Sequence, residues 1–239
     1  MIPKKIHYCW FGRGKLPPLA EKCIASWRKY CPDFEIIEWN ETNFDINSNA
    51  YVKEAYDNKK YAFVTDYVRL YVMYMQGGVY MDTDVEVIKP LDEFLNNSGF
   101  SGFESDTQIP TGIMAGEKGF PLYKKLLDYY ENRHFIDVNG KMDLTTNVNI
   151  ITSMLSESGF EPNGKFQVIE GFALYPRDVF CPLDDATGIM HDSKNTATIH
   201  WFNKSWIPAK KRLRSKITRV FHRLFGVNCF AFLKRGKKD

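Results

Sequence analysis

The sequence lacks the features of secreted, membrane-spanning and zinc-finger proteins. It has only five cysteines, scattered and never in a Cys-x-x-Cys pair, so neither a disulfide framework nor a cysteine zinc site is indicated. No apolar run reaches the roughly 18 residues that a membrane span requires. The first strand-like segment begins at Ile2, which leaves no room for a signal peptide. We therefore expect a cytoplasmic protein with reduced thiols.

Internal repeats, low-complexity linkers and the phosphate-binding Gly-x-x-x-x-Gly-Lys-Ser/Thr loop are also missing. The chain instead has an ordinary globular composition, 44% hydrophobic and 26% charged, which excludes a disordered or fibrous protein. We predict one catalytic domain over residues 1–208 and a basic amphipathic tail over residues 209–239.

Positive charge is concentrated in that tail. Residues 209–239 hold eleven Lys or Arg and one acidic residue, Asp239, a net +10; because the whole chain carries +3, residues 1–208 carry −7. An acidic body argues against a nucleic-acid partner, whereas the basic tail favours attraction to an anionic surface.

The hydrophobic pattern predicts alternating strands and helices. Strands are expected over residues 2–10, 34–39, 79–81, 85–88, 99–103, 112–115, 167–169, 173–175 and 196–200. Helices are expected over residues 17–27, 51–57, 61–76, 121–133 and 147–158. This alternation is typical of an α/β protein with a mostly parallel sheet flanked by helices.

Two carboxylates follow a short apolar strand. Val79-Tyr80-Met81 leads directly into Asp82-Thr83-Asp84, and alternate side chains of an extended segment face the same way. We therefore expect Asp82 and Asp84 to project together as part of a site for Mg²⁺ or Mn²⁺. An Asp-x-Asp is a weak signal by itself, because a chain of this length contains about one by chance.

Asp66 and Arg69 lie three residues apart on the preceding predicted helix. One interpretation is a surface ion pair of little energetic value. The other follows from lengths: the helix from Asp66 to Gly77 rises about 16 Å, and the returning strand from Gly77 to Asp82 spans about the same distance. A helix-turn-strand reversal would therefore bring Asp66 and Arg69 level with the two motif aspartates, beside a metal-bound diphosphate.

These motifs resemble those of a known family. Thr65-Asp66-Tyr67-Val68-Arg69 and Gly77-Gly78-Val79-Tyr80-Met81-Asp82-Thr83-Asp84 are similar to the signature of DXD-containing glycosyltransferases. That group includes Och1-type mannosyltransferases, bacterial capsular polysaccharide transferases and, more distantly, the clostridial toxin glucosyltransferase domains. The opening segment from Ile2 to Gly12 matches the first strand of the same group. The similarity is close over residues 1–90 and looser beyond them.

The resemblance implies a GT-A fold, with a Rossmann-like sheet, and a retaining hexosyltransferase. It implies that Asp66 and Arg69 bind the donor sugar and that Asp82 and Asp84 hold ribose, sugar and a Mn²⁺ or Mg²⁺ ion. Trp10, which ends the first strand, would pack near the nucleobase, although a core tryptophan explains it equally well. A UDP-sugar is favoured over a GDP-sugar as donor.

A late segment, His200-Trp201-Phe202-Asn203-Lys204-Ser205-Trp206, is similar to the part of GT-A enzymes that completes the site. The resemblance makes His200 the third metal ligand, against the alternative of a structural histidine. Lys204 would neutralise leaving-group charge, and Ser205 and Trp206 would close over the diphosphate. Gly112, Met114 and Asn147 are further candidate pocket residues. We name no nucleophile, and interpret Glu104 and Asp106 as loop carboxylates that stand near the acceptor at most.

The sequence thus predicts a metal-dependent transferase of bacterial capsular or surface polysaccharide synthesis, with a nucleotide-sugar donor and a lipid-linked glycan acceptor. A sugar phosphotransferase or nucleotidyltransferase and a non-catalytic carbohydrate-binding module are the alternatives. Residues 210–225 form an amphipathic pattern, which predicts peripheral contact with the inner face of the cytoplasmic membrane. The alternative is a C-terminal helix packed on the domain with a solvated basic face.

Overall fold

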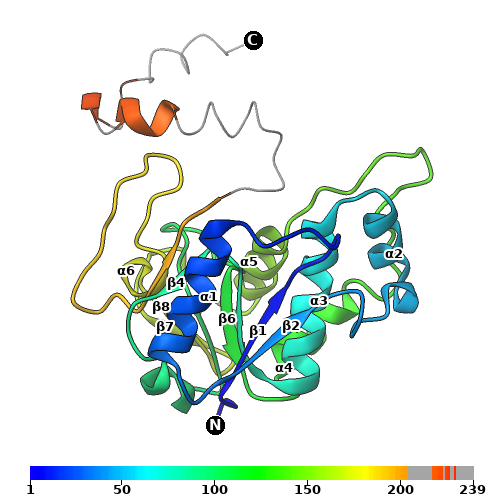
Figure 1. Ribbon diagram of the computed structural model, residues 1–239, viewed down its shortest axis with the longest axis horizontal. Helices are drawn as coiled ribbons and strands as arrows, with labels where there is room; N and C mark the ends of the chain where they lie inside the picture. Colours follow the sequence, from blue (N-terminus) through cyan, green and yellow to red (C-terminus); the bar gives the residue numbers. More distant parts are fainter. Residues whose placement is uncertain (204–216, 223, 227–228, 230–239) are drawn as a thin grey trace.

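The computed structural model describes residues 1–203, 217–222, 224–226 and 229 (Figure 1). Within these ranges the principal sheet has seven strands, in the order β2-β1-β3-β6-β5-β8-β7. The strands are β1 (Lys5–Cys9), β2 (Glu35–Trp39), β3 (Gly78–Met81), β5 (Gly99–Gly102), β6 (Ile113–Gly116), β7 (Gln167–Ile169) and β8 (Phe172–Tyr175).

The sheet is mixed. β1 pairs in parallel with β2 and β3, and β5 pairs in parallel with β8. β6 runs antiparallel to both β3 and β5, and β7 runs antiparallel to β8. The predicted α/β class, with helices flanking a large sheet, is confirmed. Two of the three antiparallel pairs, β5 with β6 and β7 with β8, join consecutive strands by loops without a helix, whereas β6 pairs with β3 across a longer stretch of chain.

A separate two-stranded ladder lies beside this sheet. β4 (Val85–Val87) pairs antiparallel with β9 (Thr198–His200), so Val85 lies opposite His200. Both segments were expected as strands, but their pairing with each other joins parts of the chain more than a hundred residues apart. This ladder decides where His200 is placed.

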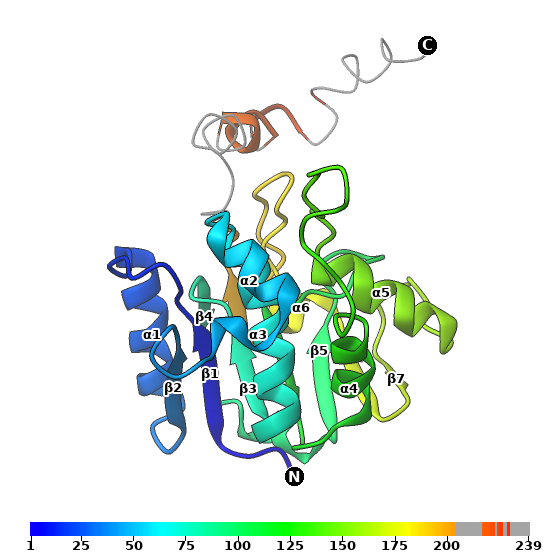
Figure 2. The same cartoon turned by 90° about the vertical axis from the view of Figure 1, so that its right-hand side faces the viewer.

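Helices cover both faces of the sheet (Figures 1 and 2). They are α1 (Pro18–Tyr30), α2 (Ala50–Asp57), α3 (Tyr61–Gln76), α4 (Pro121–Asp128), α5 (Asn147–Glu157) and α6 (Arg177–Phe180), with 3-10 turns η1 (Ile46–Ser48) and η2 (Asp92–Asn96). Alternate residues of β3 serve the two cores: Tyr80 packs with the cluster under α3, and Val79 and Met81 pack with the cluster under α1. Of the described helices, none is both long enough and apolar enough to cross a membrane.

The turn between α3 and β3 requires its two glycines. Gly77 and Gly78 have φ angles of +67° and +110°, which L side chains rarely adopt. A Cβ at Gly77 would also lie 2.5 Å from the amide nitrogen of Lys118, and one at Gly78 would lie 2.8 Å from the carbonyl oxygen of Lys5. This tight reversal sets the register between α3 and β3, on which the candidate site depends.

His7 is a fully buried histidine at the centre of the β1 strand. The Trp39 indole donates to its Nδ1 at 3.1 Å, so its Nε2 carries the proton and donates to the carbonyl of Gly77 at 2.9 Å. If Nδ1 were also protonated, its N–H would face the indole N–H of Trp39, and neither donor would have an acceptor. Burial accordingly lowers the pKa of His7 from 6.5 to about 4.

This depressed pKa predicts a pH dependence of folding. Between pH 6.5 and 4 the unfolded chain binds a proton at His7 that the folded chain refuses, so stability falls as the pH falls through this window. The loss amounts to about 3 kcal/mol at its fullest. Urea unfolding of wild type and His7→Gln should show the wild-type advantage shrinking from pH 7 to pH 4. A difference in unfolding free energy between wild type and His7→Gln that does not change with pH contradicts the prediction. His191→Gln, at an exposed histidine, is the matched control.

Candidate active site

Asp66 and Arg69 are buried on α3 and not on its surface. Their exposed fractions are 8% and 5%, and Arg69 Nη2 lies 3.3 Å from Asp66 Oδ1. The interpretation as a surface ion pair is therefore wrong. The apolar stripe of the helix packs on the sheet, and the neighbouring face, which carries these two side chains, is covered by the end of β3 and the loop before β6.

Arg69 joins α3 to these two segments. Its Nη2 lies 3.4 Å from Asp82 Oδ1, and its Nη1 donates to the carbonyl of Thr111 at 2.5 Å. The guanidinium carbon stands 4.8 Å from the centre of the Tyr80 ring, and the Tyr80 hydroxyl donates to Asp82 Oδ1 at 2.8 Å. A planar, multiply bonded arginine thus orients the first carboxylate of the motif.

The motif itself forms a turn. The strand was expected to continue extended through Asp82 and Asp84, but β3 ends at Met81 and the Val85 amide donates back to the Asp82 carbonyl at 2.9 Å. The expectation of a continuous extended segment is wrong. The reason is that β3 pairs in the principal sheet, whereas Val85 begins the separate ladder with β9, so the chain must change direction between them.

The turn and the ladder bring three side chains together. One ligand atom each from Asp82, Asp84 and His200 lies within 4.8 Å of the others. His200 Nε2 is 3.3 Å from Asp84 Oδ1, and the amide of Asn203 donates to Asp84 Oδ2 at 2.7 Å. Two carboxylates and an imidazole are a donor set suited to Mn²⁺, and their oxygens suit Mg²⁺ as well.

Two observations test whether these residues fit a cation. His200 Nδ1 is buried and has no hydrogen-bond partner among the described residues. Gly112 lets both side chains approach its backbone closely, because a Cβ there would lie 2.9 Å from His200 Nδ1 and 3.3 Å from Asp82 Oδ2. An unpartnered nitrogen and a carboxylate oxygen that meet at a residue without a side chain fit a bound divalent ion.

The electrostatics of the cluster follow from its burial and its excess of carboxylates. Burial raises the pKa of Asp66 to about 6, with Arg69 opposing and Asp82 reinforcing the rise. Although burial opposes both shifts, the attraction between Asp84 and His200 lowers the pKa of Asp84 and raises that of His200 well above its ordinary value. A divalent cation bound at the cluster would place positive charge beside Asp84, as the His200 imidazolium does in this structure.

Gly112→Ala tests the close approach of His200 and Asp82 to Gly112. The added methyl would lie 2.7 Å from His200 Cε1, which forces the imidazole or the Asp82 carboxylate to move. We expect the affinity for Mn²⁺, measured by calorimetry with a nucleoside diphosphate present, to fall about tenfold or more. Gly116→Ala is the control, since its methyl would make an equally close contact, 2.6 Å from the Tyr123 ring, at the other end of β6. Equal affinities in all three proteins would remove Gly112 from the site.

Trp10 follows β1 and lines a groove to which none of the three cluster residues contributes. The groove has a volume of about 400 Å³ and is lined by Trp10, Arg13, Gly14, Glu38, Asn40, Glu41 and Thr42. The Trp10 indole donates to the carbonyl of Gly14 at 2.6 Å, and its ring is half-buried. Part of the ring packs against the core cluster under α1, so Trp10 is a half-buried residue at the edge of the core, and its place near a nucleobase stays a prediction.

The remaining predicted residues have different surroundings. Asn147 is buried, and its side chain donates to the backbone carbonyl of Asp66 at 2.6 Å while accepting from the Tyr130 hydroxyl. Glu104, at the end of β5, is half-buried, and burial raises its pKa. Met114 packs in the core under α3 and does not line the groove at Trp10. Lys204, Ser205 and Trp206 lie outside the described residues.

Sequence reasoning missed Tyr80. Its ring lies under the Arg69 guanidinium and its hydroxyl bonds Asp82, so it is part of the site. The signal was present, because Tyr80 precedes Asp82 by two residues and side chains two apart on a strand face the same way. Thr111, which contributes only its carbonyl to Arg69, had no such signal.

Comparisons with known proteins identify a family model and several relatives that the chain resembles. Residues 17–101 match the family described as the glycosyltransferase sugar-binding region containing a DXD motif, and the match includes α3 and Asp82-Thr83-Asp84. It confirms the resemblance read from the motifs. A relative named inositol phosphoceramide mannosyltransferase 3, from Schizosaccharomyces pombe, is 29% identical over 56% of this chain and 40% of its own length. The chain therefore spans less than half of that relative.

A viral relative and a solved structure are also similar. An uncharacterized glycosyltransferase of Acanthamoeba polyphaga mimivirus is 24% identical over 88% of this chain and 86% of its own length. Among solved structures, the PaToxG glycosyltransferase has a TM-score of 0.49 and 18% identity, over 65% of this chain and 69% of that chain.

Proposed function

We propose that this chain is a metal-dependent hexosyltransferase that moves a sugar from a nucleotide sugar to a glycan with retention of configuration. The observation that carries the proposal is the cluster itself. Asp82, Asp84 and His200 lie within 4.8 Å of one another, next to the buried Asp66–Arg69 pair, and the first two belong to the matched sugar-binding region. His200 adds a nitrogen to the two carboxylates, since its Nε2 lies 3.3 Å from Asp84 Oδ1 and its buried Nδ1 has no hydrogen-bond partner among the described residues.

Each side chain has a distinct part in this mechanism. Asp82, Asp84 and His200 would hold Mn²⁺ or Mg²⁺, which when bound stabilises the negative charge that develops on the diphosphate. Arg69 holds Asp82 in place, and the Asp66 carboxylate beside it accepts hydrogen bonds from sugar hydroxyls. In the proposal Lys204 neutralises the leaving group and Ser205 and Trp206 close over it, on the strength of the sequence resemblance.

Retention needs no protein nucleophile if the acceptor hydroxyl attacks from the face that the leaving group departs. The departing phosphate then takes the hydroxyl proton. The carboxylates of Asp66 and Asp82 are both engaged by Arg69, which makes them poor nucleophiles and good positioning groups. This agrees with a reaction governed by orientation and charge stabilisation.

The donor and acceptor belong to the same proposal. We favour a UDP-sugar, with its base beside Trp10 in the groove at the ends of β1 and β2. The yeast relative is named for transfer to inositol phosphoceramide, which supports a lipid-borne acceptor. Synthesis of bacterial capsular or surface polysaccharide at the inner face of the cytoplasmic membrane is the setting that the resemblance favours.

Two other functions use similar metal sites. A sugar phosphotransferase or nucleotidyltransferase would need groups that grip a second phosphate-bearing substrate, and no complete Gly-x-x-x-x-Gly-Lys-Ser/Thr loop is present, since Gly159 to Lys165 is followed by Phe166. A carbohydrate-binding module needs no buried arginine that orients a metal ligand. The Arg69 contacts to Asp66 and Asp82 therefore favour the transferase.

One experiment separates the three. The full-length protein is incubated with Mn²⁺ and a panel of UDP- and GDP-sugars, without acceptor, and release of nucleoside diphosphate is followed. A glycosyltransferase hydrolyses its own donor slowly, and a chelator stops the release. A binding module releases nothing, and a nucleotidyltransferase or phosphotransferase yields other phosphorylated products. Either of these last two results refutes the proposal.

A further inference from the structure

The described part of the tail presents apolar side chains to solvent. Residues 217–222 and 224–225 are helical. Ile217, Val220, Phe221, Leu224 and Phe225 are exposed by 43% to 71%, and the Phe221 and Phe225 rings stack at 5.7 Å. A helix packed on the domain through its apolar face would bury these side chains, so the alternative of a helix with a solvated basic face does not describe this segment.

The same helix contacts the domain through an arginine. Arg219 Nε donates to the carbonyl of Asp185 at 3.0 Å, and its Nη2 lies 2.5 Å from Asp185 Oδ1. The aliphatic part of Arg219 packs closely on Gly188, where a Cβ would lie 3.1 Å from it. At about 100° per residue, the five apolar side chains lie on the side of the helix opposite Arg219. The helix is therefore held with its apolar side facing away from the domain.

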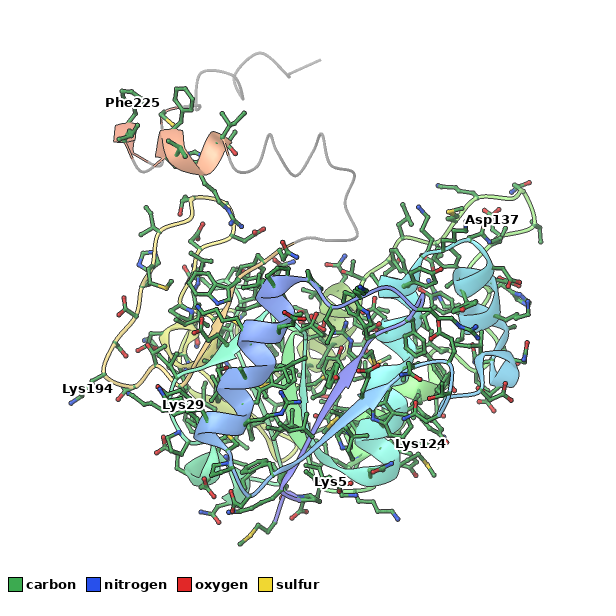
Figure 3. The ribbon with its side chains drawn as sticks, in the orientation of Figure 1. Lys5, Lys29, Lys124, Asp137, Lys194 and Phe225 are labelled. Carbon is green, nitrogen blue, oxygen red and sulfur yellow. The ribbon has the colours of Figure 1, made fainter. Side chains whose placement is uncertain are left out.

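The position of the helix is related to the candidate active site. In Figures 1 and 2 it lies beyond the upper end of the domain, toward which β1 and β3 point with their carboxyl ends. Figure 3 shows Phe225 on this helix, above the loop that carries its anchor. The turn containing Asp82 and Asp84 follows β3 at this same end of the sheet.

We propose that the helical residues 217–222 and 224–225 form a surface for binding an anionic lipid bilayer, with Arg219 holding it so that the candidate active-site end faces the membrane. The positive charge of residues 209–239 favours an anionic bilayer over a second copy of the chain as the partner of this surface. Eleven Lys or Arg and one acidic residue in residues 209–239 repel a second copy of the same tail and attract acidic headgroups. An apolar helical side bordered by basic residues inserts into the interface between headgroups and acyl chains.

The test uses the full-length chain and vesicles, without any assay of transfer. The protein should sediment with phosphatidylcholine vesicles that contain phosphatidylglycerol, less with pure phosphatidylcholine, and less as salt is added. Leu224→Glu/Phe225→Glu should lower the vesicle partition coefficient by roughly tenfold or more, because two side chains that enter the bilayer become charged.

The matched control is Phe166→Glu/Val168→Glu, which makes the same change in charge at two exposed apolar residues near β7. It should retain binding. Failure of the wild-type chain to sediment overturns the proposal, as does an equal loss in both double variants, which would indicate attraction by net charge alone. The proposal is also overturned if the wild-type chain forms a dimer that the Leu224→Glu/Phe225→Glu variant dissociates. Donor hydrolysis without vesicles reports on the proposed function separately, and the Leu224→Glu/Phe225→Glu variant should keep it.

Discussion

Asp84→Ala is expected to lower the rate of sugar transfer on the order of a thousandfold, or about 4 kcal/mol in transition-state stabilisation. Asp84 immediately precedes β4, and its carboxylate contacts the segment that contains β9. One oxygen lies 3.3 Å from His200 Nε2, and the other accepts from the Asn203 amide at 2.7 Å. Removing the carboxylate takes away one principal oxygen ligand and the charge that attracts the cation.

Asp84→Asn isolates the effect of the negative charge that attracts the cation. The amide retains an oxygen that accepts from Asn203, so the local fold should survive, while the affinity for Mn²⁺ in the presence of nucleoside diphosphate should fall toward the background value. Initial rates of nucleoside diphosphate release and calorimetric Mn²⁺ titrations measure the two quantities. Asp192→Asn, at an exposed aspartate, is the control. Turnover within a few-fold of wild type in Asp84→Ala would exclude Asp84 as a metal ligand.

Arg69→Lys should be the second most damaging change, although it conserves charge. Arg69 contacts Asp66, Asp82, the Thr111 carbonyl and the Tyr80 ring at once, and an ammonium cannot reproduce that fork. We expect a loss of activity on the order of a hundredfold. Because the side chain is buried, we also expect a loss of about 2 kcal/mol in unfolding free energy.

A second arginine provides a matched comparison. Arg133 also pairs with a carboxylate, Asp143, and lies over a tyrosine ring, that of Tyr129, but it is partly exposed and has no contact with the cluster. Arg133→Lys should leave activity within a few-fold of wild type. Transfer kinetics and chemical unfolding are measured for both variants. Equal, small losses of activity in Arg69→Lys and Arg133→Lys would show that Arg69 has no special role.

The helices and strands were largely predictable because they depend on local patterns. The spacing of apolar residues and the pair Gly77-Gly78 predicted α3 over its observed length, Tyr61–Gln76. α4 was predicted too long, since it ends at Asp128 and the chain turns through residues 129–133. The juxtaposition of Arg69 with Asp82 also followed from sequence, because a helix and a returning strand joined by a tight turn have lengths that can be compared.

What the sequence determined by itself is therefore local: the α/β class, the α3–β3 reversal and the Asp-x-Asp at its end. The tertiary structure decided the burial of Asp66 and Arg69, the turn at Asp82 and the approach of His200, which depends on Val85 pairing with a residue more than a hundred positions away. It also decided that Arg219, and not the apolar side of the tail helix, meets the domain. Periodicity shows which side chains share a face of one element, but which element covers that face depends on contacts between distant segments, and these exist only in the folded chain.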